Sequence, residues 1–223
     1  MYISQAALYE GRGNSGVILA QIIRGLFDCL KENLDWKMST IPIALATAKN
    51  KAYSSVSDPV EGTMLTVIGE MSDQLNKTFS ETETDLETLL QILSEFAKQS
   101  VTNTPNHMKL LEESGVVDSG GYGIEIIVKA IELSCLHPMS LDLSTTVRTP
   151  EDSGQKIKQS LGQHFDHEES YGFCTQFVLI SECGEDALRS NLETLCTSLV
   201  LLSDTPVNRI HLHTDDVESV LSV

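Results

Sequence analysis

Apolar side chains recur every third or fourth position through the first 134 residues, and this period predicts a series of α-helices joined by short loops. The helical pattern covers residues 17–30, 41–53, 64–75, 86–96 and 124–133. The polar residues 80–85 and the surroundings of Pro105 are expected to form loops, because polar clusters and prolines commonly bound helices. Since no convincing alternating pattern precedes residue 170, the first part of the chain is predicted to be all-α.

The period changes in the last third of the chain. Residues 171–181, 199–202 and 209–214 show the short apolar or alternating pattern of β-strands. Leucines at helical spacing span residues 187–199, between the first and second of these strands. This part is therefore predicted to be a small α+β domain.

A segment rich in proline, serine and threonine, residues 137–153, is predicted to link the two parts. A short helix-like piece at residues 155–165 follows it. The expected fold is therefore multi-domain, all-α and then α+β, with domains at residues 1–136 and 154–223.

The composition excludes two classes of function. The 223 residues carry a formal charge of −17 with only 15 lysines and arginines, whereas nucleic-acid and anionic-membrane surfaces need a basic patch. The most hydrophobic stretch is interrupted by Lys129 and Glu132, so no transmembrane segment is expected. The N-terminus lacks the order of a signal peptide, and the five cysteines are scattered, which indicates reduced thiols and a cytoplasmic location.

Three glycine-marked turns each precede a helical pattern. The first is Gly-Arg-Gly-Asn-Ser-Gly at residues 11–16, the second lies at residues 58–64, and the third lies at residues 115–123. Glycine lets the backbone approach a ligand closely, and the free N–H groups of a helix N-terminus attract anions. Each turn taken alone is equally well explained as an ordinary helix start that binds no ligand. Arg12 would pair either with a phosphate or with a neighbouring carboxylate. Three such turns in one domain would converge on one polyanion.

In this order and spacing, the three turns resemble the DhaL-type nucleotide-binding domain of the dihydroxyacetone kinase family, and most closely its fatty acid kinase A-like branch. The resemblance implies an incomplete all-α helical barrel that binds the phosphates of ATP. The residues that it assigns to nucleotide contact are Asn14, Ser15, Gly62, Thr63, Met64, Asp118, Ser119, Gly120 and Gly121. None of them is a general base, so the catalytic residues stay unassigned.

The chain departs from this family pattern at its start. DhaL-type domains begin with a helix and an aspartate-rich loop of the Asp-Gly-Asp-Thr-Gly kind, which holds the magnesium ions that grip the nucleotide phosphates. The first ten residues already resemble the segment directly before the Gly11 turn, so the magnesium ligands are expected to be missing from this chain. Because phosphoryl transfer depends on positioning and charge neutralisation, the chain alone is expected to be a poor kinase or none.

A separate group of side chains predicts a metal site in the last domain. His211 and His213 are two residues apart on an expected strand and therefore project from one face, and Cys174 lies on another expected strand. Two imidazoles and a thiolate suit zinc, with water or another side chain as the fourth ligand, although a His-x-His pair is commonly a solvated strand face. His164 and His167 compete as metal ligands but are expected to lie in a solvated acidic loop.

The motifs Tyr-Gly-Phe-Cys-Thr and His-Leu-His-Thr around these residues resemble the fatty acid kinase A middle domain, in which a cysteine and two histidines bind zinc. Gln176 departs from that pattern, which commonly has glutamate there.

In that family the kinase subunit transfers the γ-phosphate of ATP to a fatty acid presented by a separate acyl-binding protein. The resemblance thus implies a relative shortened at both ends that has such a partner, and a homodimer is a further expectation. Two alternatives stay open: a dihydroxyacetone (glycerone) kinase-like enzyme, and a non-catalytic nucleotide- or protein-binding module.

Overall fold

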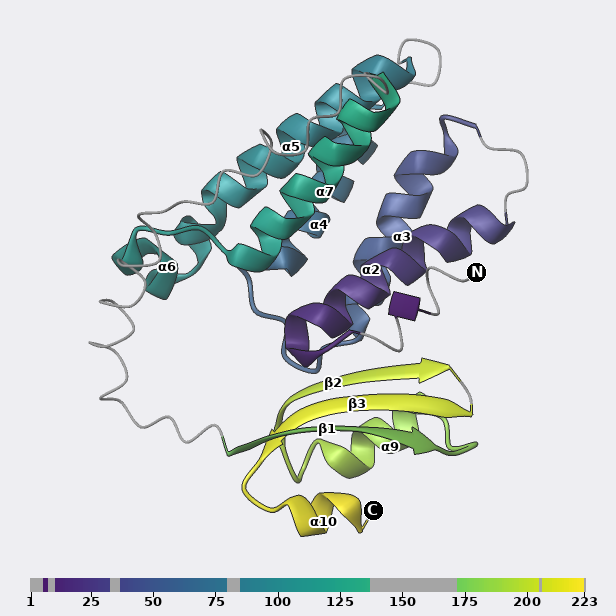
Figure 1. The fold of residues 1–223 in the computed structure, drawn as a ribbon, viewed down its shortest axis with the longest axis vertical. Helices are drawn as coiled ribbons and strands as arrows, with labels where there is room; N and C mark the ends of the chain where they lie inside the picture. The colour runs from purple at the N-terminus through teal and green to yellow at the C-terminus, as the bar shows by residue number, and fades with distance from the viewer. Residues whose placement is uncertain are drawn as a thin grey trace. The chain divides into compact units, whose positions relative to one another are not determined.

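The computed structural model describes residues 6–7, 11–32, 37–79, 85–136, 172–204 and 206–222 (Figure 1). The helical region contains α2 (Gly13–Glu32), α3 (Thr40–Ser54), α4 (Met64–Thr78), α5 (Leu86–His107), α6 (Lys109–Ser114) and α7 (Ser119–Leu136). It is followed by β1 (Phe173–Ile180), α9 (Glu185–Leu192), β2 (Thr197–Asp204), β3 (Val207–Thr214) and α10 (Val217–Leu221). The expected order of an all-α region and then an α+β region is confirmed.

Contacts divide these elements into two compact units. One unit contains α2, residues 47–59 and the sheet with α9 and α10, whereas the other contains the start of α3 and helices α4 to α7. Part of the helical region therefore folds with the C-terminal sheet. No described helix combines the length and the apolar character that crossing a bilayer requires.

Several expectations fall outside the described residues. These are the loop at residues 80–84, the linker at residues 137–153, the helix at residues 155–165, and the side chains of His164 and His167. The expected domain limits likewise stay predictions.

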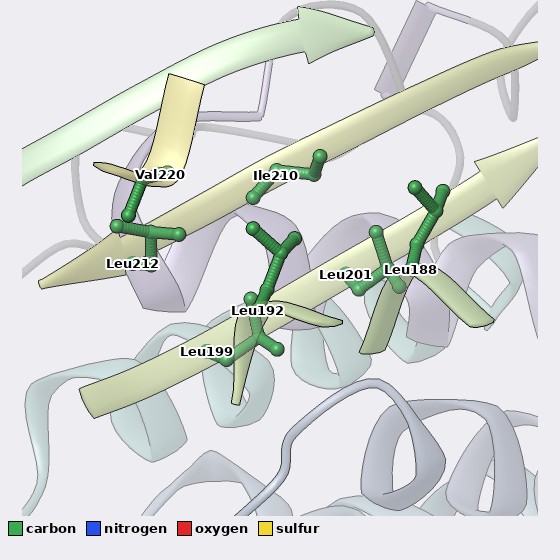
Figure 2. Packing of buried hydrophobic residues seen from close by; sticks show 7 residues of the cluster. All are labelled: Leu188, Leu192, Leu199, Leu201, Ile210, Leu212 and Val220. Carbon is green, nitrogen blue, oxygen red and sulfur yellow. The ribbon is translucent and has the colours of Figure 1, made fainter. Parts of the chain in front are cut away.

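The three strands form an antiparallel sheet in the order β1-β3-β2. Side chains alternate between the two faces of a strand, so each face of β2 presents its own set of apolar residues. On one face, α9 and α10 cover a core that Figure 2 shows, made of Leu188, Leu192, Leu199, Leu201, Ile210, Leu212 and Val220. On the other face, Val200 and Leu202 pack against Val17 and Ala20 of α2. β2 is therefore buried on both faces.

The edge of β2 that faces away from β3 is paired by the segment that follows α3. The Leu201 N–H donates to the Ser55 carbonyl at 3.1 Å, and the Ser57 N–H donates to the Leu199 carbonyl at 3.2 Å. Val56, between the two serines, packs against the α2-facing cluster. Because an open sheet edge exposes unpaired backbone groups, this pairing closes the edge of β2 with residues from the helical region.

In the other unit, α4, α5 and α7 pack against one another around an apolar core. Its buried members are Leu65, Val67, Ile68, Met71, Leu75, Leu89, Leu93, Ala97, Val101 and Ile124. Side-chain oxygens begin two of these helices: Thr63 accepts from the Leu65 N–H at 3.3 Å, and Asp85 accepts from the Thr88 N–H at 2.8 Å. These N-caps satisfy backbone donors that have no partner inside the helix.

The loop expected around Pro105 is wrong, because Pro105 lies inside α5, in its last turn. Proline has no N–H to donate to the carbonyl four residues earlier, which here is that of Val101. The Thr104 hydroxyl donates to that carbonyl instead, at 2.7 Å. A side-chain donor thus replaces the missing backbone donor, and the helix continues to His107.

The helix expected over residues 187–199 is wrong in its extent, because α9 ends at Leu192 and Leu199 belongs to β2. Both leucines pack in the core of Figure 2, so their helical spacing reflects a common buried position rather than one continuous helix. Between them the chain turns at Leu195, whose carbonyl accepts from the Thr214 hydroxyl at 2.8 Å.

We predict that Leu201→Ala lowers the free energy of unfolding by about 2–5 kcal/mol, because this fully buried side chain would leave a cavity in the sheet core. Chemical denaturation followed by circular dichroism measures the change. Ile180→Ala in β1 is the matched control: its side chain is 76% exposed, and its truncation should change the free energy by less than about 0.5 kcal/mol. Equal losses in the two variants would contradict the burial described for β2.

Candidate functional site

Cysteine and histidine side chains meet on one face of the sheet. β1 and β3 pair antiparallel, with Cys174 opposite His213 and Gln176 opposite His211. Directly opposed residues share a face, and so do residues two apart along one strand. One potential ligand atom from each of Cys174, His211 and His213 lies within 4.8 Å of those of the other two. The structure thus brings together the three side chains that the sequence assigns to a metal site.

His211 is the most enclosed member of this group. Only 3% of it is exposed, and its Nδ1 has no hydrogen-bond partner among the described residues. Burial lowers the pKa of His211 below its ordinary value, and the neighbouring His213 lowers it further. A lowered pKa favours the neutral imidazole, which is the form that binds a metal ion.

This donor set fits a zinc ion. A buried nitrogen without a partner is unfavourable, and a metal ion bound by the ring would remove that penalty. One thiolate and two imidazoles are common zinc ligands, and three protein ligands leave a fourth tetrahedral position for water or another group. Cys174 is exposed, which gives an ion access from solvent.

The first glycine turn leads directly into α2. Gly13 has a φ of +62°, a left-handed conformation that glycine adopts without strain. A side chain at Gly11 would come within 2.6 Å of the Gly16 carbonyl oxygen, so the turn is tight enough to exclude one. Asn14 is half-buried and its Oδ1 has no hydrogen-bond partner in the described part of the chain, whereas Ser15 is exposed. The start of a long helix suits an anion through its backbone N–H groups, although the unpartnered Asn14 Oδ1 itself only accepts hydrogen bonds.

The second turn, at Gly62, is also left-handed, with a φ of +85°. A side chain at Gly62 would collide with Met108 and with the Thr104 carbonyl oxygen, so the turn lies close against the end of α5. The Gly62 N–H donates to the Thr66 hydroxyl at 2.7 Å, and Thr63 is the N-cap of α4. Local hydrogen bonds thus give both residues a role in starting a helix.

In the third turn, Asp118 begins α7, because its Oδ2 accepts from the Gly121 N–H at 2.6 Å. Its own N–H donates to the Thr104 hydroxyl at 3.0 Å, and the adjacent Ser119 is exposed. Since Gly62 also lies against Thr104, the second and third turns meet at the C-terminal end of α5. The structure thus brings two of the three predicted turns together.

Gly120 and Gly121 also have a packing role. A side chain at Gly121 would lie 2.8 Å from a methyl group of Val67, and one at Gly120 would lie 3.0 Å from the terminal methyl group of Met64, which is buried. The two glycines therefore let the start of α7 approach α4 closely. The first turn belongs to the other compact unit, so a common nucleotide site for all three turns stays a prediction.

The sequence analysis did not identify two buried side chains near these sites, Thr104 and Arg209. Thr104 connects Val101 to Asp118 through its hydroxyl, and the one sequence signal for it is the proline that follows, which leaves a carbonyl in need of a donor. Arg209 is only 7% exposed and lies two residues before His211 on β3, so the period of the strand places it on the same face as His211.

Two protein families match this chain, one over each of its two parts. A model of the DAK2 domain matches residues 1–133, and a model of the fatty acid kinase A-like middle domain matches residues 170–223. The chain is 29% identical to Protein YloV of Bacillus subtilis, over 99% of this chain and 41% of that protein. It is 33% identical to the uncharacterized protein MG369 of Mycoplasma genitalium, over 93% of this chain and 39% of that protein.

The chain therefore belongs to the DAK2 domain family and joins this domain to a fatty acid kinase A-like middle domain, as its motifs predict. These domains support a kinase-family subunit. The chain spans about two fifths of the length of the curated relatives it matches.

We predict that Asp118→Ala lowers the free energy of unfolding by about 1 kcal/mol, because the N-cap of α7 is lost. Asp118→Asn keeps an acceptor oxygen for the Gly121 N–H and should stay close to the wild type. Urea denaturation measures both. Identical stability of the alanine variant and the wild type would show that the cap contributes nothing.

Proposed function

We propose that this chain forms part of an ATP-dependent kinase subunit that phosphorylates a fatty acid, and that a separate protein presents the fatty acid. The observation that supports this most directly is the presence in one chain of a DAK2 domain and a fatty acid kinase A-like middle domain. A dihydroxyacetone (glycerone) kinase-like enzyme would share the first domain but not the second. The γ-phosphate of ATP is the transferred group, and the product is an acyl phosphate.

In this proposal the glycine turns bind the nucleotide. Backbone N–H groups at tight turns and helix starts hold phosphates without the bulk of a side chain. Asn14 and Ser15 are the proposed phosphate contacts at the start of α2. The residues of the second and third turns are proposed nucleotide contacts within their own compact unit. Because the chain has a net charge of −17, a divalent cation such as Mg²⁺ is needed to neutralise the phosphates.

We predict that the 223-residue polypeptide binds Mg·ATP but turns it over at the background rate. Its sequence contains no Asp-Gly-Asp-Thr-Gly loop to hold the metal ion against the transferring phosphate. A fluorescent-nucleotide titration measures binding, and release of ADP measures turnover. Robust magnesium-dependent turnover would refute the predicted inactivity, and absence of binding would refute the nucleotide site.

A pair of glycine variants tests where the nucleotide binds. Gly62→Val places a branched side chain at a φ of +85° and against Met108, so nucleotide affinity should fall roughly tenfold or more. Gly123→Ala is the matched control, because a side chain there meets open space. The comparison is made on variants that still unfold cooperatively.

We propose further that Cys174, His211 and His213 hold a zinc ion. The unpartnered, buried nitrogen of His211 and the clustering of three soft or borderline donors support this assignment. Zinc at this position supplies a cross-link between the two strands and a Lewis-acidic site with an exchangeable fourth ligand.

We predict about one zinc ion per wild-type chain and almost none in a His211→Ala/His213→Ala variant. Elemental analysis of the purified proteins measures the metal. His107→Ala is the matched control, since His107 ends α5 in the other compact unit, and its loss should leave the zinc content unchanged. Equal zinc in the wild type and the double variant would end the proposal.

A non-catalytic nucleotide- or protein-binding module is the second candidate function. The observation that favours it is that Thr63 and Asp118 already cap their own helices, so neither turn requires a ligand to satisfy these groups. Binding of ATP without any phosphoryl transfer, after an aspartate loop has been added at the N-terminus, would support this alternative over a kinase.

A further inference from the structure

A hollow of about 300 Å³ lies at the end of the sheet, beside the metal-site side chains. His213 belongs both to the cluster with Cys174 and His211 and to the lining of this hollow. A molecule seated in the hollow would therefore lie next to an ion that His213 binds. The volume is at the lower limit of small-molecule pockets, so the hollow suits only a small ligand.

The other side chains around the hollow give it a negative charge. Asp215 and Asp216 line it together with the hydroxyl-bearing Thr194 and Thr197, and no lysine or arginine occurs among the described residues that line it. Aspartate is ionised at neutral pH. The hollow therefore attracts a cationic group and repels an anionic one, a phosphate included.

The two aspartates differ in their other contacts. The Asp216 carboxylate accepts from the Ser219 hydroxyl at 2.6 Å and from the Ser219 N–H at 3.0 Å, so it caps α10. The hydroxyl bond, and then the backbone bond, lower the pKa of Asp216. The Asp215 carboxylate makes no hydrogen bond to a described residue, so it is the one available to a ligand.

Gly172 brings the Asp215 carboxylate to the end of the metal-site strand. It directly precedes β1 and has a φ of +61°, a conformation that favours glycine. A side chain at Gly172 would come within 2.6 Å of the Thr214 carbonyl oxygen and 2.9 Å of an Asp215 carboxylate oxygen. The carboxylate thus occupies the space that a side chain would take, two residues before Cys174.

A second thiol at the hollow, that of Cys196, leaves the metal site open. Its sulfur does not belong to the cluster of ligand atoms, and it donates to the Leu192 carbonyl at 3.0 Å. Burial raises the pKa of Cys196, and Glu193 raises it further, so the thiol stays protonated. A zinc ion on three protein ligands therefore keeps its fourth position for a molecule from solution.

We propose that this hollow is a binding site for a small organic cation that gives one donor atom to the metal ion and places its positive group against Asp215. The proposal rests on the zinc site proposed above and names the chemical class of its fourth ligand. Because the hollow repels anions, a nucleotide or a free phosphate is not this ligand.

The experiment uses the full 223-residue chain loaded with Co²⁺, whose visible absorption reports a change of ligand. Three small thiols that differ in charge are titrated under nitrogen: cationic thiocholine, neutral mercaptoethanol and anionic mercaptoethanesulfonate. Each offers one sulfur to the metal. We expect thiocholine to bind most tightly and the sulfonate most weakly. The preference is the ratio of these two dissociation constants, and it is compared between variants, so the acidity of the thiols themselves cancels.

Asp215→Asn keeps the size of the side chain and removes its charge. It should lower the preference for thiocholine about fivefold, because one lost charge acts on two ligands of opposite sign. Asp186→Asn is the matched control, since Asp186 is exposed on α9 and does not line the hollow. It removes the same charge from the chain and should leave the preference unchanged. Added NaCl should weaken the preference of the wild type, because salt screens exposed charges.

The outcomes separate the charge of the hollow from the metal site. An equal preference in the wild type and Asp215→Asn would overturn the proposal, and so would an equal loss in Asp186→Asn. If Asp215→Asn does not fold, the salt series decides, and a preference that salt leaves unchanged would overturn the role of charge. If Co²⁺ binds but no thiol alters its spectrum, the fourth position is closed and only this proposal fails. If Co²⁺ does not bind, the metal site and its proposed ligand fail together.

Discussion

The burial of β2 on both faces is the constraint on which the rest of this structure depends. Leu199 and Leu201 face α9 and α10, whereas Val200 and Leu202 face α2. Full burial of each such side chain contributes about 1.5–3 kcal/mol, which only an apolar cover on each side can provide. The second cover comes from the helical region, as does the segment that pairs the edge of the strand. The face of the sheet that carries Cys174, His211 and His213 is therefore also the face that α2 covers.

This arrangement explains why polar groups gather beneath α2. His211, Arg209 and Gln176 occupy the part of the face that lies next to the apolar contacts of Val200 and Leu202. Buried polar groups need hydrogen-bond partners. Here the Arg209 guanidinium donates to the carboxamide oxygen of Gln176. His211 has a buried nitrogen that the described residues leave without a hydrogen bond, which suits the proposed metal ion. The side chains proposed for function on this face are therefore also part of its buried packing.

Thr104 has a comparable role in the helical unit. Its hydroxyl serves the carbonyl that Pro105 leaves without a donor, and it accepts from the N–H of Asp118. The end of α5 is thereby joined to the start of α7, with Gly62 packed against it. Glycines that a sequence motif assigns to a ligand thus also have a packing reason to be small, so the motif alone does not separate the two roles.

The sequence by itself determined what depends on local period and chemistry. The 3.6-residue pattern identified the helices, the two-residue spacing of His211 and His213 placed them on one face, and the short apolar run at residues 199–202 marked a buried strand. It did not show that Pro105 continues a helix, that Leu199 leaves one, or that Arg209 and Thr104 serve the sites. Only the tertiary structure decided these. The Thr104 hydroxyl that replaces the backbone donor at Pro105 also accepts from the N–H of Asp118, 14 residues away. The helix that covers the second face of β2 lies far away along the chain.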